Sequence, residues 1–519
     1  MEMTAVEESK LDTNNGSSKL DPEDTSKLPR DETVENNDGS KLSGKKLEEP
    51  PTAVVSWDED SQNPYNWSMT KRVYHTVLIG MFGLTVTFAS SVYTPAVPEI
   101  MRVFNVSETA ALLPFCLFLL GLGFGPVLAA PLSEKFGRTS TYMISLPIFA
   151  LFIVGAGASQ TFGGLVACRL LAGIFGSPPL VVGAGTNADL WKPESRAVTA
   201  TLFALCPYLG PALGPLIGGF TVPKKGWRWT EWIILFFAFV SLAAALGMKE
   251  TYKKTILERN AKKHGNKAKP GLSGMVALKF MFYITLFRPL HMLYTEPIVI
   301  AWSFYIGFNF AVLYSFFAAF PFVYTTVYGF DTQQIGLTFI PFAIGSIGAT
   351  ITVILVDRLW YQKQHTSRNS RWNDGLVPPE YRLHSAMLGG FGLPIGLFWF
   401  AWTAKPEIHW ISSVIASTFI AWGNLCVFMS GLLYLLDVYE ALMGASAIAA
   451  TSLLRYVLAA VFPLFITPMY SHLHVGWATS IFGFISVALM PIPWVLLKWG
   501  PYLRQRSKLA KSSAPATTI

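Results

Sequence analysis

The sequence of 519 residues lacks several signatures of catalysis and of nucleotide-driven work. It contains no G-x-x-x-x-G-K-[ST] phosphate loop, so no site for ATP is visible. It also lacks an H-E-x-x-H helix and a G-x-S-x-G elbow, which argues against an enzyme embedded in a membrane. The four cysteines have no paired spacing, and His472 and His474 come nearest to a metal pair. We therefore expect no catalytic residue, no cofactor and no bound metal ion.

Charge is also scarce, and this scarcity indicates the class of protein. Only 14% of residues are charged, 52% are hydrophobic and the mean hydropathy is +0.40. Apolar runs long enough to cross a bilayer recur after residue 70. Twelve such runs predict an all-α integral membrane protein, with spans at 73–93, 109–129, 141–159, 163–186, 197–221, 232–248, 297–324, 333–356, 384–404, 408–434, 444–468 and 476–498.

The net charge of +8 comes from Lys and Arg residues in the segments between these spans. If the twelve helices alternate in direction, nearly all of these basic segments lie on one side, apart from a cluster at residues 224–228. The positive-inside rule then places both termini in the cytosol. Basic segments that alternate with membrane spans fit contact with lipid headgroups and argue against nucleic-acid binding.

The spans fall into two sets of six, separated by a polar segment. We expect a disordered cytosolic tail at residues 1–70, in which the aromatic residues of 57–68 lie at the membrane interface. A six-helix half follows at 71–249, a cytosolic loop at 250–296, a second half at 297–498 and a cytosolic tail at 499–519. Two pseudo-symmetric halves around a central cavity are typical of secondary transporters.

Three motifs in the first half resemble those of the major facilitator superfamily. They are "APLSEKFGR" at residues 130–138, "RLLAGIFG" at 169–176 and "GPALGPLIGG" at 210–219. The last is similar to a helix-five motif of drug:proton antiporters with twelve helices. The segments "GWRWTEW" and "NPYNWS" look like fungal members of that branch, which include multidrug, azole-resistance and polyamine exporters. The resemblance implies the major facilitator fold and transport driven by an ion gradient.

The helix-five motif contains glycines every four residues, and they share one helix face. Such a face admits a neighbouring backbone, while each proline removes a donor and bends the helix. We expect this helix to act as a pivot and seal between the halves. The resemblance ties the motif to export, and its residues are Gly210, Pro211, Gly214, Pro215, Gly218 and Gly219.

Charged residues at the helices give further candidates. Arg169 and Arg455 lie inside spans, where an unneutralised cation costs at least about 2.5 kcal/mol on insertion scales. Glu296, at the cytosolic start of helix seven, is the expected carboxylate for proton coupling. Because no acid is visible deep in a span, we expect neutral or anionic cargo rather than polyamines.

The resemblance implies a gating loop at the cytosolic ends of the first-half helices. In the family, acid and base pairs here lock the two halves together when the cavity faces outward. In this sequence the matching residues are Glu134, Lys135, Gly137, Arg138 and Asp189.

Helix seven is rich in aromatic residues that could face a central cavity and bind flat ligands. We expect Tyr305, Phe308, Asn309, Phe316 and Phe320 to line it.

The sequence thus predicts a monomeric, multi-pass, proton-coupled exporter of small organic compounds in the plasma membrane. Asn105, in an N-x-S sequon on an external loop, is a candidate for glycosylation. Two alternatives remain open: a dedicated exporter of one endogenous secondary metabolite or organic acid, and a membrane sensor that does not transport.

Overall fold

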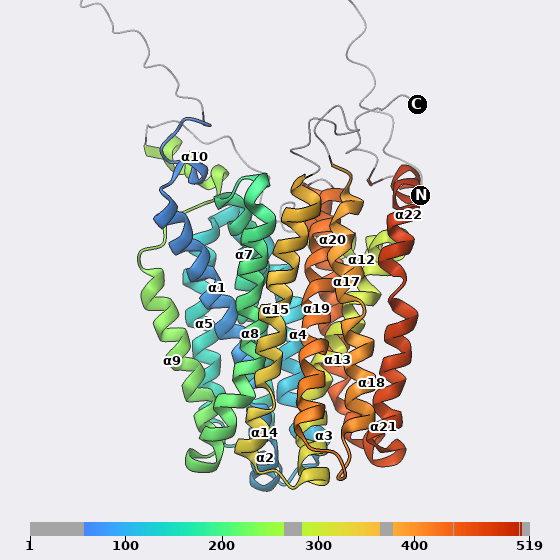
Figure 1. The fold of residues 1–519 in the computed structure, drawn as a ribbon. Helices are drawn as coiled ribbons and strands as arrows, with labels where there is room; N and C mark the ends of the chain where they lie inside the picture. Colours follow the sequence, from blue (N-terminus) through green and yellow to red (C-terminus); the bar gives the residue numbers. More distant parts are fainter. Residues whose placement is uncertain (1–56, 264–282, 364–376, 440, 508, 511–519) are drawn as a thin grey trace, which may run out of the picture. The chain divides into compact units, whose positions relative to one another are not determined.

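The computed structural model describes residues 57–263, 283–363, 377–439, 441–507 and 509–510, and every regular element in them is helical (Figure 1). The first set of helices comprises α1 (Met69–Ser91), α2 (Val97–Phe104), α3 (Glu108–Ala111), α4 (Leu113–Phe136), α5 (Arg138–Ala158), α6 (Phe162–Gly176), α7 (Pro178–Leu190), α8 (Pro193–Lys225), α9 (Arg228–Ala245) and α10 (Lys253–Lys263). The second comprises α12 (Arg288–Thr295), α13 (Pro297–Tyr328), α14 (Thr332–Leu337), α15 (Ile340–Val356), α17 (His384–Gly389), α18 (Gly392–Thr403), α19 (Ile411–Val438), α20 (Ala441–Val461), α21 (Pro463–Leu489) and α22 (Ile492–Arg506). Both sets also contain short 3₁₀ helices, at Pro64–Asn66, Thr94–Ala96 and Pro379–Leu383, and the second set contains short π-helices at Tyr283–Phe287 and Asp357–Tyr361.

Twelve of the helical stretches in the described residues are long and apolar enough to cross a membrane. The predicted all-α class with twelve spans is therefore confirmed. The last two crossings meet inside α21, where His474 has a left-handed φ of 60° and interrupts the helix. This kink falls between the predicted spans 444–468 and 476–498.

Helices of the same set make most of the packing contacts. In the first set α1 packs on α8, and α4 and α5 pack on α6. In the second set α13 packs on α20, and α15 and α18 pack on α19. The two sets meet where α8 packs on α14 and α15, and where α4 packs on α20. We call these sets the first half and the second half.

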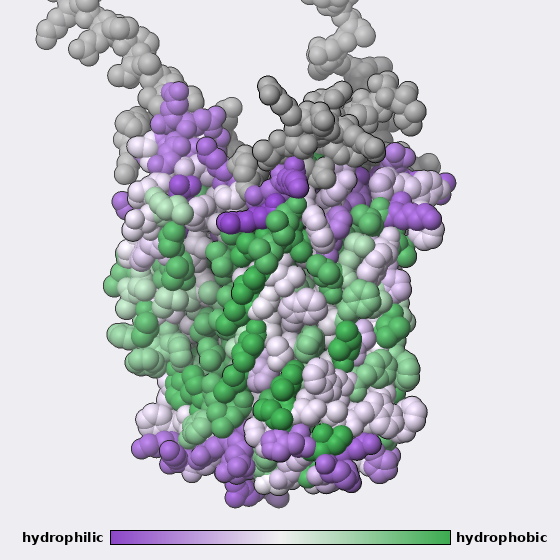
Figure 2. Space-filling model, in the orientation of Figure 1, coloured by the Kyte–Doolittle hydropathy of each residue, from purple (hydrophilic) through white to green (hydrophobic). Residues whose placement is uncertain are grey.

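The bundle has two ends, named here by one residue each. The Met69 end carries the start of α1, α10 and the end of α22, and lies at the top of Figure 1. The Asn105 end carries α2, α3 and α14, and lies at the bottom. Between them, Figure 2 shows a band of hydrophobic side chains with hydrophilic residues at both ends. On α9, Phe236 and Phe239 are exposed, as expected for a surface that faces lipid.

The ordered structure extends beyond the predicted halves. Residues 57–70, expected as part of a disordered tail, are structured: Trp67 is buried against Leu190 and Trp191, and the Tyr65 hydroxyl donates to the carbonyl oxygen of Ala188 at 3.1 Å. The tail expectation was wrong for these residues because their aromatic rings pack on the end of α7. Residues 1–56 lie outside the described part.

The segments at 250–296 and 499–519 also contain helix. The first holds α10 and α12, and α22 continues past residue 498 to Arg506. The predicted boundaries of these two segments therefore mark where the sequence becomes polar, and they do not coincide with the ends of helices.

Candidate functional site

A buried ion pair joins α6 to α9. Arg169 Nη2 lies 2.5 Å from Glu231 Oε1, and both side chains are 0% exposed. Arg169 Nη1 also donates to the carbonyl oxygen of Ala89 in α1 at 2.7 Å, and the guanidinium lies 4.8 Å from the ring centre of Tyr93. Arg169 Nε and Glu231 Oε2 have no hydrogen-bond partner among the described residues. Glu231 Oε2 is therefore the oxygen that can take up a proton.

Protonation of Glu231 would change the energetics of this pair. While Glu231 is ionised, the two charges neutralise each other in surroundings that exclude water. With Glu231 protonated, Arg169 remains charged because a guanidinium does not lose its proton. An unpaired buried charge costs several kcal/mol, which favours a rearrangement of the helices that hold it. Protonation of Glu231 would therefore favour a different packing of α6 and α9.

The position of this pair corrects two expectations. Glu231 is a fully buried acid in the first turn of α9, one residue before the predicted span 232–248. From the sequence we selected Glu296 as the carboxylate for proton coupling and did not select Glu231, which the structure places beside Arg169. Glu296 caps α13 at the opposite, Met69 end, where it accepts a hydrogen bond of 3.0 Å from the Tyr439 hydroxyl. In the sequence, the acid of "GWRWTEW" was the available signal.

Arg455, on α20, occupies a different environment. Its guanidinium lies 4.6 Å from the ring centre of Phe310, 4.8 Å from that of Phe428 and 4.7 Å from that of Tyr456. No carboxylate lies within 4.0 Å of it in the described part of the chain, and its Nε has no hydrogen-bond partner there. Tyr208, from α8, packs on Phe428 with ring centres 5.6 Å apart. We call Tyr208, Phe310, Phe428 and Tyr456 the aromatic cage.

The aromatic residues of α13 do not all face this cage. Phe316 and Phe320 pack on Phe400 of α18, and Phe308 packs on Phe482 of α21. Tyr305 stacks on Trp302 of its own helix. The expectation that these four line a central cavity was wrong, because they fill the interior of the second half.

A different face of α13 meets the first half, and its residues are not the ones that were expected to line the cavity. Tyr314 and Phe317 pack on Phe115 of α4, and Phe310 contacts Tyr208 of α8. Asn309 is linked to this region only through Asn424 of α19: the backbone carbonyl oxygen of Asn309 accepts a hydrogen bond of 2.6 Å from Asn424 Nδ2, and Asn424 Oδ1 accepts one of 3.0 Å from the Tyr208 hydroxyl of α8. Because both faces of α13 are apolar and buried, residue type alone does not distinguish them.

At the Met69 end, part of the expected gating loop forms a network. Arg138 Nε lies 3.3 Å from Asp189 Oδ2, and Glu250 Oε1 accepts from the backbone N–H of Arg138 at 2.9 Å. Gly137 has a φ of +97°, and a side chain there would collide with Glu250. The Arg138–Asp189 pair joins α5 to α7 within the first half. In this structure it does not form the expected lock between the two halves.

Two residues of the expected gating loop lie outside the network. The side chains of Glu134 and Lys135 are exposed, and neither makes an ion pair in the described residues.

The second half has a similar network that the sequence did not reveal. Arg382 Nη1 lies 2.6 Å from Asp357 Oδ1, and its Nε lies 2.8 Å from Asp437 Oδ2. Asp357 is the acid of the second-half link between helices two and three, next to Arg358. Its partner Arg382 and the acid Asp437, however, come from segments that are distant in sequence. Each half therefore has its own network of ion pairs at the Met69 end.

The glycine face of α8 packs closely, as predicted, but on a helix of its own half. A Cβ on Gly214 would lie 2.6 Å from the backbone nitrogen of Val92, and one on Gly218 would lie 2.7 Å from the carbonyl oxygen of Val92. Gly210 lies against Phe88 in the same way. This face therefore joins α8 to α1, and its expected position between the halves was wrong. The helix is continuous through Pro211.

The contact of α8 with the second half uses another side of the helix. A Cβ on Gly219 would lie 2.7 Å from the carbonyl oxygen of Thr332, and one on Gly336 would lie 2.7 Å from that of Pro215. Backbone therefore meets backbone where α8 crosses α14 at the Asn105 end.

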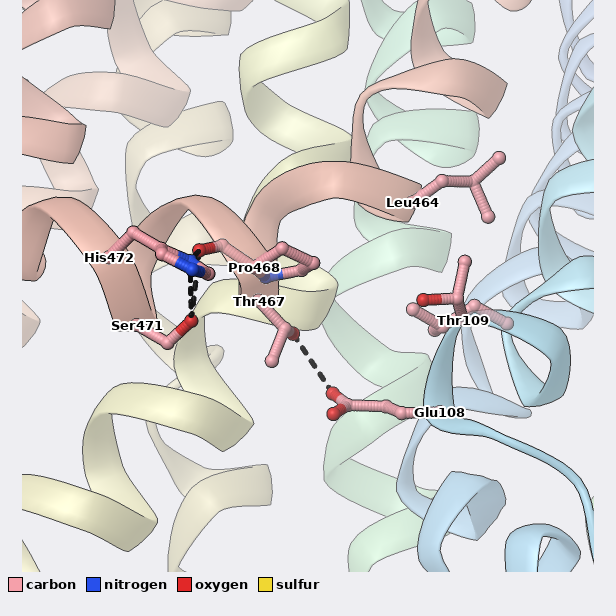
Figure 3. A pocket seen from close by; sticks show the side chains of 8 residues that line it. Glu108, Thr109, Leu464, Thr467, Pro468, Ser471 and His472 are labelled. Carbon is pink, nitrogen blue, oxygen red and sulfur yellow. Dashed lines mark hydrogen bonds between the residues drawn. The ribbon is translucent and has the colours of Figure 1, made fainter.

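A second contact between the halves at this end lines a pocket of about 300 Å³ (Figure 3). The Thr467 hydroxyl of α21 donates to Glu108 Oε1 of α3 at 2.9 Å. His472 also lines the pocket, and its Nδ1 lies 2.7 Å from the carbonyl oxygen of Pro468. The Asn105 end is thus closed by α8 against α14 and by Glu108 against Thr467.

Removing the Thr467 hydroxyl should loosen this closure. In Thr467→Val the halves lose one hydrogen bond, which is worth about 1 kcal/mol or roughly fivefold in an equilibrium. We expect a cysteine introduced at Leu112 to react about fivefold faster with an impermeant maleimide supplied on the Asn105 side. The control is Thr109→Val in the same pocket, because the Thr109 hydroxyl makes no hydrogen bond to any described residue. Equal labelling rates in both variants would show that the bond does not hold the end closed.

Two helical halves that meet at one end, with buried charges among membrane-length helices, are typical of secondary transporters. The sequence profile of the Major Facilitator Superfamily matches residues 79–463. The chain therefore belongs to the Major Facilitator Superfamily, as its motifs predicted, and it is a transporter rather than an enzyme.

Relatives place it near fungal efflux pumps. It is 38% identical to Polyamine transporter 4 of Saccharomyces cerevisiae, covering 96% of this chain and 79% of the relative. It is 35% identical to the efflux pump FUB11 of Gibberella moniliformis, and the alignment covers 91% of this chain and 80% of the relative. It is also 35% identical to the citrinin biosynthesis cluster MFS transporter mrr1 of Monascus ruber, and the alignment covers 89% of this chain and 94% of the relative.

The fold matches a solved transporter of the same superfamily. The proton:xylose symporter XylE aligns with a TM-score of 0.62 at 18% identity, over 83% of this chain and 97% of that one. At this identity the match concerns the fold alone.

Proposed function

We propose that this transporter exports small organic compounds in exchange for protons by alternating access. The observation that carries the proposal is the Arg169–Glu231 pair, which is fully buried and has one carboxylate oxygen without a partner in the described residues. Uptake of a proton there leaves an unpaired charge among α1, α6 and α9, and a change of helix packing relieves it. A gradient can thereby drive the cycle.

The orientation follows from the distribution of charge. The Met69 end carries most of the basic segments, so the positive-inside rule supports a cytosolic location for this end and both termini. Asn105 then lies outside, where its exposed side chain is accessible for glycosylation. We place the protein in the plasma membrane as a monomer that works with cargo, protons and lipid.

The names of the relatives favour export and leave three kinds of cargo to distinguish. Similarity to FUB11 supports a general or specific efflux pump, and similarity to the citrinin cluster transporter supports a dedicated exporter of one secondary metabolite. Similarity to Polyamine transporter 4 adds polyamines to the candidates. A flux assay separates all of these from a sensor that does not transport.

The energy source is tested with purified protein in vesicles. With an imposed proton gradient we expect uphill movement of cargo, and an uncoupler should abolish it because the gradient is the sole driving force. ATP should not restore it, in line with the missing phosphate loop. The assay uses a cationic, a neutral and an anionic compound of similar size. Uphill transport that persists after the gradient has collapsed would contradict proton coupling.

A further inference from the structure

Among the described residues, two arginines of the membrane region are buried, and they differ in how their charge is balanced. Arg169 has a carboxylate at 2.5 Å and a backbone carbonyl at 2.7 Å. Arg455 is 7% exposed, has three aromatic rings within 4.8 Å, and has no carboxylate within 4.0 Å in the described residues. Aromatic faces attract a cation, but each contributes only about 0.5 to 2 kcal/mol and none carries a counter-charge. The described core therefore retains one positive charge that no neighbouring carboxylate neutralises.

This charge lies where the halves meet. Arg455 is on α20, whose neighbour across the boundary is α4: a Cβ on Gly123 would lie 2.8 Å from Tyr456 Cβ. Tyr208 completes the aromatic cage from α8, and its hydroxyl donates to Asn424 Oδ1 of α19 at 3.0 Å. Each of these residues lies well inside its helix and away from both ends of the bundle. A ligand here would contact both halves, as alternating access requires.

The chemistry of the cage defines a complementary ligand. A guanidinium presents a planar fork of donors that matches a carboxylate, and the Nε–H of Arg455 is unused in the described structure. Phe310, Phe428 and Tyr208 offer flat faces that stack on an aromatic ring. A polyamine would bring a second positive charge to a site that already has one.

We propose that the aromatic cage and Arg455 form the cargo site, and that its ligand is a flat aromatic carboxylate. The carboxylate pairs with the guanidinium and the ring lies among the cage aromatics. This assignment names the cargo class for the exporter proposed above and so rests on that function, but binding itself needs no gradient. Because Tyr208 and Asn424 join the halves, ligand entry must break their hydrogen bond.

Binding to the purified full-length protein in detergent tests the assignment. The probes are naphthoate, the neutral naphthamide and the cationic naphthylmethylamine, which share one ring system. We expect naphthoate to bind at least about tenfold more tightly than naphthamide, the factor for an added charge-assisted hydrogen bond, and the amine to bind most weakly. Arg455→Gln should reduce naphthoate affinity to that of naphthamide. Lys498→Gln, which removes an exposed charge on α22, should change neither.

Two further variants separate the parts of the site. Arg455→Lys should keep the preference for naphthoate but weaken it, because an ammonium lacks the planar fork, and it replaces the glutamine variant if that one does not fold. Phe428→Leu should weaken naphthoate and naphthamide alike. Glu231→Gln should retain the preference even where proton-driven transport is lost, which distinguishes a failure of coupling from a failure of this site.

The proposal is overturned if wild-type protein does not bind naphthoate, or binds naphthamide or the amine as tightly. It is also overturned if folded Arg455→Gln retains the preference for naphthoate.

Discussion

Glu231→Gln is expected to abolish proton-driven efflux and to destabilise the protein. Glutamine has nearly the same shape as glutamate but does not ionise, so Arg169 loses the counter-charge that lies at 2.5 Å. Breaking a buried ion pair in this way costs about 3 to 5 kcal/mol. Arg169→Gln should have the same two effects, because it leaves the Glu231 carboxylate unpaired. Efflux from vesicles and thermal unfolding of the purified protein measure the two effects separately.

A double variant distinguishes a role in coupling from a role in folding. Arg169→Gln with Glu231→Gln removes both charges together, so stability should largely return, but no group remains in the pair that can ionise. We expect normal surface levels and no response to the proton gradient. Arg102→Gln, which removes an exposed arginine of α2, is the control for loss of a positive charge. Gradient-driven efflux by the double variant would show that the proton is carried elsewhere.

The second large effect is expected at Gly219, where the halves touch. In Gly219→Leu the new Cβ would lie 2.7 Å from the Thr332 carbonyl oxygen, so α8 and α14 cannot approach each other as they do now. The interface between halves must open during transport and can yield, whereas packing inside a half cannot. We therefore expect a folded protein at the cell surface that fails to close its Asn105 end and loses nearly all of its transport activity. Cargo efflux, surface level and maleimide labelling at the Asn105 end measure this.

Two other glycines provide the comparison. In Gly214→Leu the side chain would collide with the Val92 backbone nitrogen at 2.6 Å within the first half, so the protein should fail to fold and surface levels should fall. Gly163, at the start of α6, has open space around it: a Cβ added there would meet no described atom within 4 Å, so Gly163→Leu should behave as wild type. If Gly219→Leu closes and transports normally, the contact of α8 with α14 is not part of the cycle.

Much of the candidate site was predictable because some of its signals are local. Arg169 stands out since a charge within an apolar run is costly wherever the run folds. Gly137 and Arg138 lie in a short motif, and the structure places Asp189 3.3 Å from Arg138. The missed residues have no such local signal: Glu231 lies at a span boundary, and Arg382 pairs with acids from two other segments.

The faces of helices were the least predictable feature. In a soluble helix the apolar stripe identifies the buried side, but in a lipid-embedded helix both sides are apolar. On α13 this ambiguity led us to expect Phe316 and Phe320 at a cavity, although they pack on Phe400. It also led us to leave out Tyr314, which packs on Phe115 of the first half. On α8 the same ambiguity placed the glycine face between the halves.

The amino-acid sequence by itself determined the membrane class, the twelve spans and the family. These depend on the length of apolar runs and on short motifs, which are properties of neighbouring residues. Only the tertiary structure decided that Glu231 neutralises Arg169 while Arg455 has aromatic rings and, among the described residues, no carboxylate beside it. Arg169 and Glu231 are 62 positions apart, and in lipid no hydrophobic stripe directs one helix face toward another. Close backbone packing and buried charge pairs decide which faces meet, and these exist only after the helices have assembled.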